Sequence, residues 1–110
     1  MSLQVACKAS AVASGAVRRA VVDNVMLAIV HAPDGQWYAL AGQCSHMGSS
    51  LAGGEVIVDG DTCLLRCPGH GALFDVATGR PTTGPAFAPI ATYPVVLDGD
   101  AVLVDVEGVK

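Results

Sequence analysis

The sequence predicts an all-β fold, and three observations lead to that prediction. Asp-Gly pairs stand between alternating apolar runs, which is a strong signal for hairpins. Thirteen glycines and six prolines divide the 110-residue chain into short pieces. No segment sustains a helical spacing of apolar residues over several turns. We therefore expect many short strands in one antiparallel meander or barrel.

Each predicted hairpin consists of two runs rich in β-branched residues, which favour strands, around a short polar turn. In chain order the predicted strands are a run ending at 21–22, then 25–31, 36–41, 55–58, 62–66, 90–97 and 101–106. The turns between paired strands fall at 23–24, 33–35, 59–61 and 98–100. The Ala-rich stretch 6–20 could suggest a helix, but its serines and Gly15 weaken that interpretation.

Two stretches do not fit hairpin chemistry. Residues 41–54 are rich in Gly and Ser, and residues 67–89 are rich in Gly and Pro. Long irregular loops in so small a domain usually carry function. We therefore expect the functional site to lie in these two stretches.

Charge and hydropathy narrow the classes of function. The net charge of -4 and the isoelectric point near 5.0 argue against nucleic acid as the main partner. The mean hydropathy of +0.51 is high, but the longest apolar run covers only residues 25–30 and ends at His31. A spanning helix needs about 20 apolar residues. We expect no signal peptide, no membrane anchor and a cytoplasmic location.

Two pairs of soft-metal ligands lie in the irregular stretches. Cys44 and His46 form a C-x-H pair, and Cys67 and His70 form a C-x-x-H pair, each beside glycine. Thiolate and imidazole together suit zinc, iron or an iron–sulfur cluster. Without a secretory signal, disulfides among the four cysteines are not expected.

Zinc and a two-iron cluster are both compatible with two Cys and two His. A structural zinc site can use this donor set, and so can a cluster in which two His replace two Cys on one iron. Zinc sites normally take both ligands of a Cys pair from one knuckle, whereas each loop here supplies one Cys and one His. This arrangement favours a cluster, with each loop contributing one ligand to each iron. A zinc-stabilised binding module stays as a weaker alternative.

The two motifs resemble the cluster-binding boxes of Rieske [2Fe-2S] proteins. Residues 44–48 read CSHMG and residues 67–75 read CPGHGALFD. Residues 78–80, 84–86 and 89–90 resemble the rest of the second box and the Pro loop of that family. The resemblance extends over about residues 21–106, nearly the whole chain. The spacer of twenty residues between His46 and Cys67 is longer than in compact members, which leaves its path open.

The resemblance implies a fold and a ligand set. It implies a single domain over 1–110, with antiparallel base strands in about 1–41 and 86–110 and a cluster-binding insert in about 42–85. One [2Fe-2S] cluster per chain would be the cofactor. By position in the boxes, the buried iron would be held by Cys44 and Cys67, and the outer iron by His46 and His70.

The resemblance also implies a function. The chain would be a one-electron carrier rather than an enzyme, a ferredoxin that passes electrons from a flavin-dependent reductase to the terminal oxygenase of a ring-hydroxylating or similar system. The alternative is a Rieske-like small subunit of a larger reductase, such as assimilatory nitrite reductase. Members of that class often lack the ligands, and all four are present here.

The residues around the boxes predict a low reduction potential. High-potential members have cysteines that form a disulfide where Ser49 and Gly69 stand, and Ser and Tyr hydroxyls where Ala72 and Phe74 stand. Hydrogen bonds to the sulfurs raise such potentials because they stabilise the added electron. The absence of these groups indicates a soluble, low-potential ferredoxin.

The remaining candidates have structural interpretations. Cys7 and Cys63 are expected to pack as small apolar residues in strands. His31 is expected at the surface or as a capping residue. Trp37 and Tyr38 should point to opposite faces of one strand. The aspartates of the last two turns are favoured as hairpin residues over groups that dock a basic partner.

Overall fold

The computed structural model describes residues 3–42, 51–68, 71–83 and 89–108, which form three antiparallel sheets. Sheet 1 has the strand order β1-β11-β10, sheet 2 the order β2-β3-β4-β9, and sheet 3 the order β5-β6-β7-β8. The strand bounds are Gln4–Lys8 (β1), Ala16–Val22 (β2), Val25–His31 (β3), Trp37–Ala41 (β4), Glu55–Asp59 (β5), Thr62–Arg66 (β6), Leu73–Asp75 (β7), Pro81–Thr83 (β8), Thr92–Tyr93 (β9), Val95–Asp98 (β10) and Ala101–Val104 (β11). The predicted all-β fold is confirmed.

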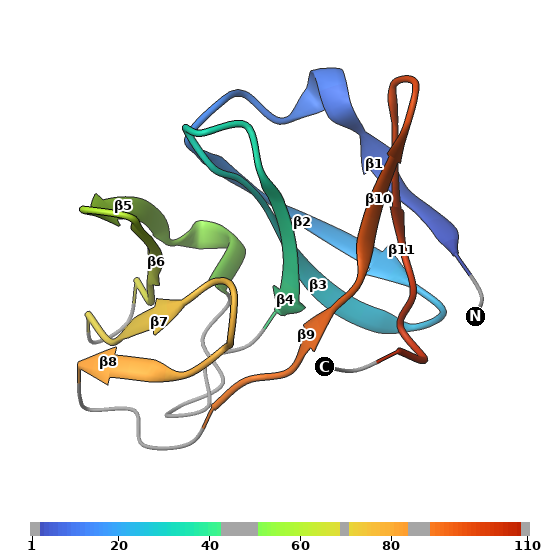
Figure 1. Cartoon of the computed structure of the whole chain (residues 1–110). Coiled ribbons are helices and arrows are strands. Elements are labelled where there is room, and N and C mark those ends of the chain that lie inside the picture. Colours follow the sequence, from blue (N-terminus) through green and yellow to red (C-terminus); the bar gives the residue numbers. More distant parts are fainter. Residues whose placement is uncertain (1–2, 43–50, 69–70, 84–88, 109–110) are drawn as a thin grey trace.

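Sheet 2 lies between the other two sheets, and its two faces serve two cores (Figure 1). Because alternate strand residues point to opposite faces, Leu27 and Ile29 pack toward sheet 1 whereas Ala28 and Val30 pack toward sheet 3. Core 1, between sheets 1 and 2, has the buried residues Ala20, Val22, Leu27, Ile29, Ala39, Val102 and Val104. Core 2, between sheets 2 and 3, has the buried residues Ala28, Val30, Leu40, Leu51, Leu65, Cys67, Ala72, Phe74, Val76 and Ile90.

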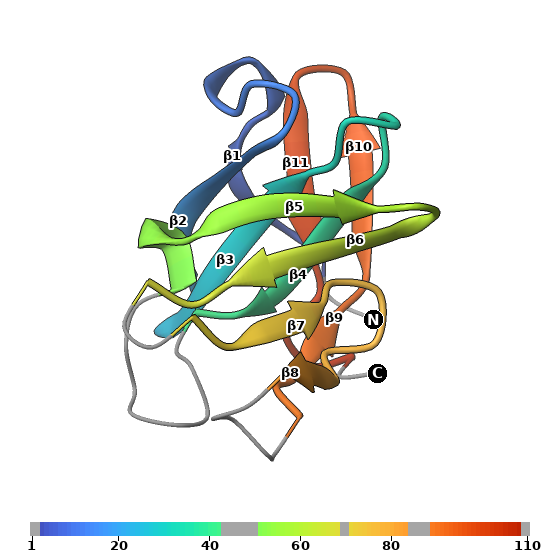
Figure 2. The same ribbon diagram turned by 90° about the vertical axis from the view of Figure 1, so that its left-hand side faces the viewer.

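The neighbours Trp37 and Tyr38 confirm this division. Trp37 packs against core 1 and Tyr38 against core 2, as the alternation of a strand predicts. Sheet 3 consists wholly of residues between 55 and 83, and Figure 2 shows it lying across the face of sheet 2.

The predicted hairpins are confirmed. β2 and β3 pair from Ala16↔His31 to Val22↔Val25, and the turn between them has Asp23 and Asn24 at φ of 53° and 65°. Two consecutive positive φ angles are typical of the tight turns that match strand twist. The Ala-rich stretch contains no α-helix within its described residues: a 3-10 turn, Ala9–Ala11, joins β1 to β2.

The predicted strand over 90–97 is wrong in one respect, because the structure divides it between two sheets. β9 pairs with β4 in sheet 2, whereas β10 pairs with β11 in sheet 1. Pro94 separates them, and proline has no N–H to donate to a sheet ladder. Its carbonyl oxygen instead accepts from the Asp105 N–H at 3.2 Å.

Two strands were missed in the stretch predicted to be irregular. β7 and β8 lie within residues 67–89, and both are three residues long. Such short strands leave little alternation for a sequence pattern to show. The segment between the two motifs forms the 3-10 turn Leu51–Gly53 and the β5–β6 hairpin. No helix in the described part of the chain is long and apolar enough to cross a membrane.

Candidate metal centre

Cys67 is the one predicted ligand that lies within the described residues. Cys44, His46 and His70 lie outside them. Cys67 directly follows β6, its side chain is 2% exposed, and its thiol is free. A buried, unpaired thiol at the end of a strand fits the role of a cluster ligand, since a thiolate is the donor that such clusters require.

Backbone hydrogen bonds close the loop that follows Cys67. The Cys67 N–H donates to the Ala72 carbonyl at 2.7 Å, and the Gly71 N–H donates to the Cys67 carbonyl at 3.1 Å. Gly71 has a φ of 76°, a conformation that favours glycine. β6 and β7 continue the pairing on either side, with Leu65 opposite Phe74. The second motif is therefore fixed at the mouth of a hairpin.

The two ends of the segment that contains the first motif are also held together. The Gly42 N–H donates to the Met26 carbonyl at 2.9 Å, and the Leu51 N–H donates to the Gly42 carbonyl at 2.8 Å. Leu51 is fully buried and belongs to core 2 with Cys67. The chain on the C-terminal side of the first motif thus packs in the same core as the first ligand of the second motif.

A third contact holds the chain next to the predicted Pro loop, of which residues 84–88 lie outside the described structure. The Ile90 N–H donates to the Gly79 carbonyl at 2.9 Å, beside the turn between β7 and β8. Gly79 has a φ of 76°, and a Cβ there would collide with the Ile90 carbonyl oxygen. This glycine therefore permits a close backbone approach that a larger residue would prevent.

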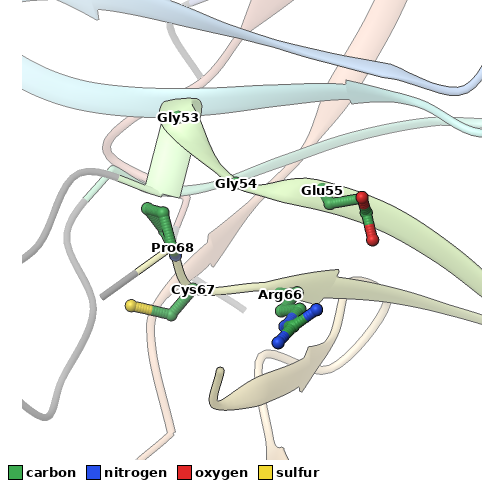
Figure 3. A pocket seen from close by; sticks show the side chains of 6 residues that line it. All are labelled: Gly53, Gly54, Glu55, Arg66, Cys67 and Pro68. Atoms are coloured by element: carbon green, nitrogen blue, oxygen red, sulfur yellow. The ribbon is translucent and has the colours of Figure 1, made fainter. Parts of the chain in front are cut away.

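An open hollow of about 360 Å³ lies beside Cys67 (Figure 3). The residues that line it come from the β5 and β6 ends of sheet 3: Gly53, Gly54, Glu55, Arg66, Cys67 and Pro68. The Arg66 guanidinium reaches Gly71, with its Nη2 and Nε 3.4 and 3.5 Å from where a Gly71 Cβ would be. Arg66 was not among the predicted site residues, although its place directly before Cys67 was a usable signal.

The low-potential prediction concerns four positions, and the structure describes two of them. Ala72 and Phe74 are fully buried and share core 2 with Cys67, and neither side chain carries a hydroxyl. Ser49 and Gly69 lie outside the described residues.

The other described cysteines and His31 have structural surroundings. Cys7 packs against core 1 and Cys63 against core 2, and burial raises the pKa of both thiols. His31 Nδ1 lies 3.0 Å from the Val12 carbonyl oxygen, and its ring stacks on Trp37 with centroids 4.0 Å apart. Within the part of the chain that the structure describes, no three His, Cys, Asp or Glu residues gather as a metal site.

Comparison with known proteins identifies a family and close structural matches. The sequence model of the Rieske [2Fe-2S] domain matches residues 2–94. The 3-phenylpropionate/cinnamic acid dioxygenase ferredoxin subunit of Shigella flexneri serotype 5b (strain 8401) is 31% identical over 100 residues, which cover 91% of this chain and 90% of that protein.

Solved ferredoxins match in fold and in sequence. The ferredoxin of carbazole 1,9a-dioxygenase from Nocardioides aromaticivorans IC177 has a TM-score of 0.84 and 30% identity, covering 94% of this chain and 97% of that one. A chain in the complex of reduced oxygenase and oxidised ferredoxin in carbazole 1,9a-dioxygenase has a TM-score of 0.80 and 33% identity, covering 98% and 95%. A putative nitrite reductase small subunit from Mycobacterium tuberculosis has a TM-score of 0.84 over 94% and 93% of the chains, but its 18% identity indicates the fold alone.

Proposed function

The chain belongs to the Rieske [2Fe-2S] domain family and is a ferredoxin, and we propose that it carries single electrons from a flavin-dependent reductase to a terminal oxygenase. Its cofactor is a [2Fe-2S] cluster, which when bound accepts and gives up one electron. The relatives are named as ferredoxin subunits, so the chain is the electron-transfer component of an oxygenase system and not its catalytic enzyme.

The proposed ligands are Cys44, His46, Cys67 and His70. Two thiolates and two imidazoles are the donor set of a Rieske cluster. The observation that carries the assignment is that both motifs adjoin core 2. Leu51, which follows the first motif, and the buried Cys67 of the second motif both pack in this core. Backbone hydrogen bonds to the carbonyl groups of Gly42 and Ala72 restrain the chain beside the ligand motifs, which limits the rearrangement needed when the cluster binds.

The proposed domain organisation has base strands in about 1–41 and 86–110 and a cluster-binding insert in about 42–85. Its support is that sheet 3 takes all its strands from residues 55–83, whereas sheets 1 and 2 take theirs from the two ends of the chain. A cytoplasmic location belongs to the same proposal.

The partner assignment rests on what similar proteins are named to do. One similar structure is a complex of oxygenase and ferredoxin in carbazole 1,9a-dioxygenase, and the Shigella relative is a dioxygenase ferredoxin subunit. The alternative, a small subunit of nitrite reductase, has support from fold only.

The ligand proposal is tested by two cysteine variants at opposite ends of β6. We expect the purified protein to be brown, to hold about two iron atoms and two sulfides per chain, and to give the Rieske EPR signal when reduced. Cys67→Ser should lose the cluster, whereas the matched control Cys63→Ser, four positions earlier, should keep it. A colourless protein containing zinc, or a Cys67→Ser variant with an unchanged signal, would contradict the proposal.

A further inference from the structure

Arg66 places a positive charge at the edge of the second motif. It is the last residue of β6 and directly precedes Cys67, but its side chain is exposed whereas the Cys67 thiol is buried. Figure 3 shows the two side chains leaving the strand in different directions. The guanidinium therefore does not cover the thiol itself.

The guanidinium instead lies against the loop that the thiol begins. Its Nη2 and Nε approach the place where a Cβ on Gly71 would lie, and Gly71 directly follows the predicted ligand His70. The loop is closed by its own backbone bonds, from Cys67 to Ala72 and from Gly71 to Cys67. Because these bonds do not involve the Arg66 side chain, the loop has a support that is independent of the charge.

Glu55 is the opposing charge in the same hollow. It is the cross-strand partner of Arg66 in the β5–β6 register and is exposed. It lies one strand farther from Cys67 than Arg66 does, so the positive charge is the nearer of the two to the ligand loop.

We propose that the positive charge of Arg66 raises the reduction potential of the cluster held by Cys67 and its partner ligands. Reduction adds one negative charge to the centre, and a nearby cation stabilises that charge more than it stabilises the oxidised state. Because Arg66 is exposed, solvent and salt screen the effect, which makes it moderate and dependent on ionic strength. The inference rests on the proposed function, since it takes Cys67 as a ligand.

The experiment compares reduction potentials by protein-film voltammetry on the intact, cluster-bearing protein. Arg66→Gln should lower the equilibrium constant for reduction about three- to tenfold, roughly 30 to 60 mV at 59 mV per tenfold for one electron. Arg66→Lys keeps the charge, and its equilibrium constant for reduction should stay within about twofold of that of the parent protein. Glu55→Gln removes the opposing charge and should shift the potential upward.

A remote arginine provides the matched control. Arg18 is exposed on β2 and its charge acts on Cys7, which packs against core 1. Arg18→Gln changes the net charge by the same amount as Arg66→Gln, yet it should leave the equilibrium constant for reduction within about twofold of that of the parent protein. The difference between the parent and Arg66→Gln should also shrink as the salt rises from about 0.01 M to about 1 M, because the screening length falls from about 30 Å to about 3 Å.

The outcomes separate this inference from the proposed function. A parent protein without a Rieske cluster would overturn the proposed function and this inference with it. A cluster-bearing parent whose Arg66→Gln variant keeps the same potential at low salt overturns the inference alone. If Arg66→Lys falls as far as Arg66→Gln, the side chain acts by its contact with Gly71 and not by its charge, which also overturns the inference.

Discussion

Replacing Gly79 by alanine should destabilise the protein by about 2–5 kcal/mol, because two independent costs meet at this residue. An L residue in the left-handed region costs about 1–2 kcal/mol, and Gly79 has a φ of 76°. Overpacking a filled site costs a further 1–3 kcal/mol or so, and the new Cβ would collide with the Ile90 carbonyl oxygen and lie 3.2 Å from Thr92 Cγ2. The Gly79–Ile90 hydrogen bond of 2.9 Å would then lengthen or break.

The assay is thermal unfolding of the cluster-bearing protein at one fixed scan rate, followed by circular dichroism and by the visible absorbance of the cluster. At roughly 4 °C per kcal/mol for a domain of this size, Gly79→Ala should lower the midpoint by about 8 to 20 °C. Gly99→Ala is the matched control, because Gly99 has a φ of 59° but nothing within 4 Å of its Cβ position. Equal midpoint shifts in the two variants would refute the reasoning from close approach.

Three further predictions concern the potential, a thiol and a carboxyl. Ala72→Ser and Phe74→Tyr each introduce a hydroxyl into the core of Cys67 and should raise the potential measured by voltammetry; no rise in either would contradict the hydrogen-bond account. Burial raises the Cys63 pKa above 9.0, so alkylation of this thiol by iodoacetamide at pH 8 should be slower than that of a free thiol. The contribution of the neutral thiol to stability is present below the unfolded-state pKa and is lost as the pH rises through the folded-state pKa. Ser10 donates to the Asp100 carboxylate through Oγ and N–H, both at 2.8 Å, and these bonds lower the Asp100 pKa; in Ser10→Ala the NMR titration of this carboxyl should therefore move to higher pH, and an unmoved titration would exclude the hydroxyl as the cause.

The hairpins could be predicted from sequence because their signals are local. Asp-Gly turns and β-branched alternation predict the β5–β6 and β10–β11 hairpins, and the structure has both. The opposite faces of Trp37 and Tyr38 follow from strand geometry alone. The family resemblance, in turn, depended on the two ligand motifs and on residues 78–80, 84–86 and 89–90.

The passage of the chain from sheet 2 to sheet 1 at Pro94 could not be predicted, because it depends on a pairing between strands that are distant in sequence. β10 pairs with β11 in a local hairpin, but β9 pairs with β4, which lies far from Pro94 in sequence. The contacts of Gly79 and Arg66 were missed for a related reason. Gly79 matters through the Ile90 backbone and Arg66 through Gly71, and neither contact leaves a periodic pattern in the sequence.

The two cores should respond differently to loss of the cluster. Core 2 contains Cys67, Leu51 and Ala72, which adjoin the ligand motifs, whereas core 1 contains none of the described residues that adjoin them. Because metal binding and the order of the ligand loops are thermodynamically linked, removal of iron should loosen core 2 first. Hydrogen exchange of the apoprotein should therefore show lost protection in β6 and β7, with protection kept in β11, whose buried Val102 and Val104 pack in core 1. Uniform loss of protection across all three sheets would mean that the cluster stabilises the whole domain as one cooperative unit.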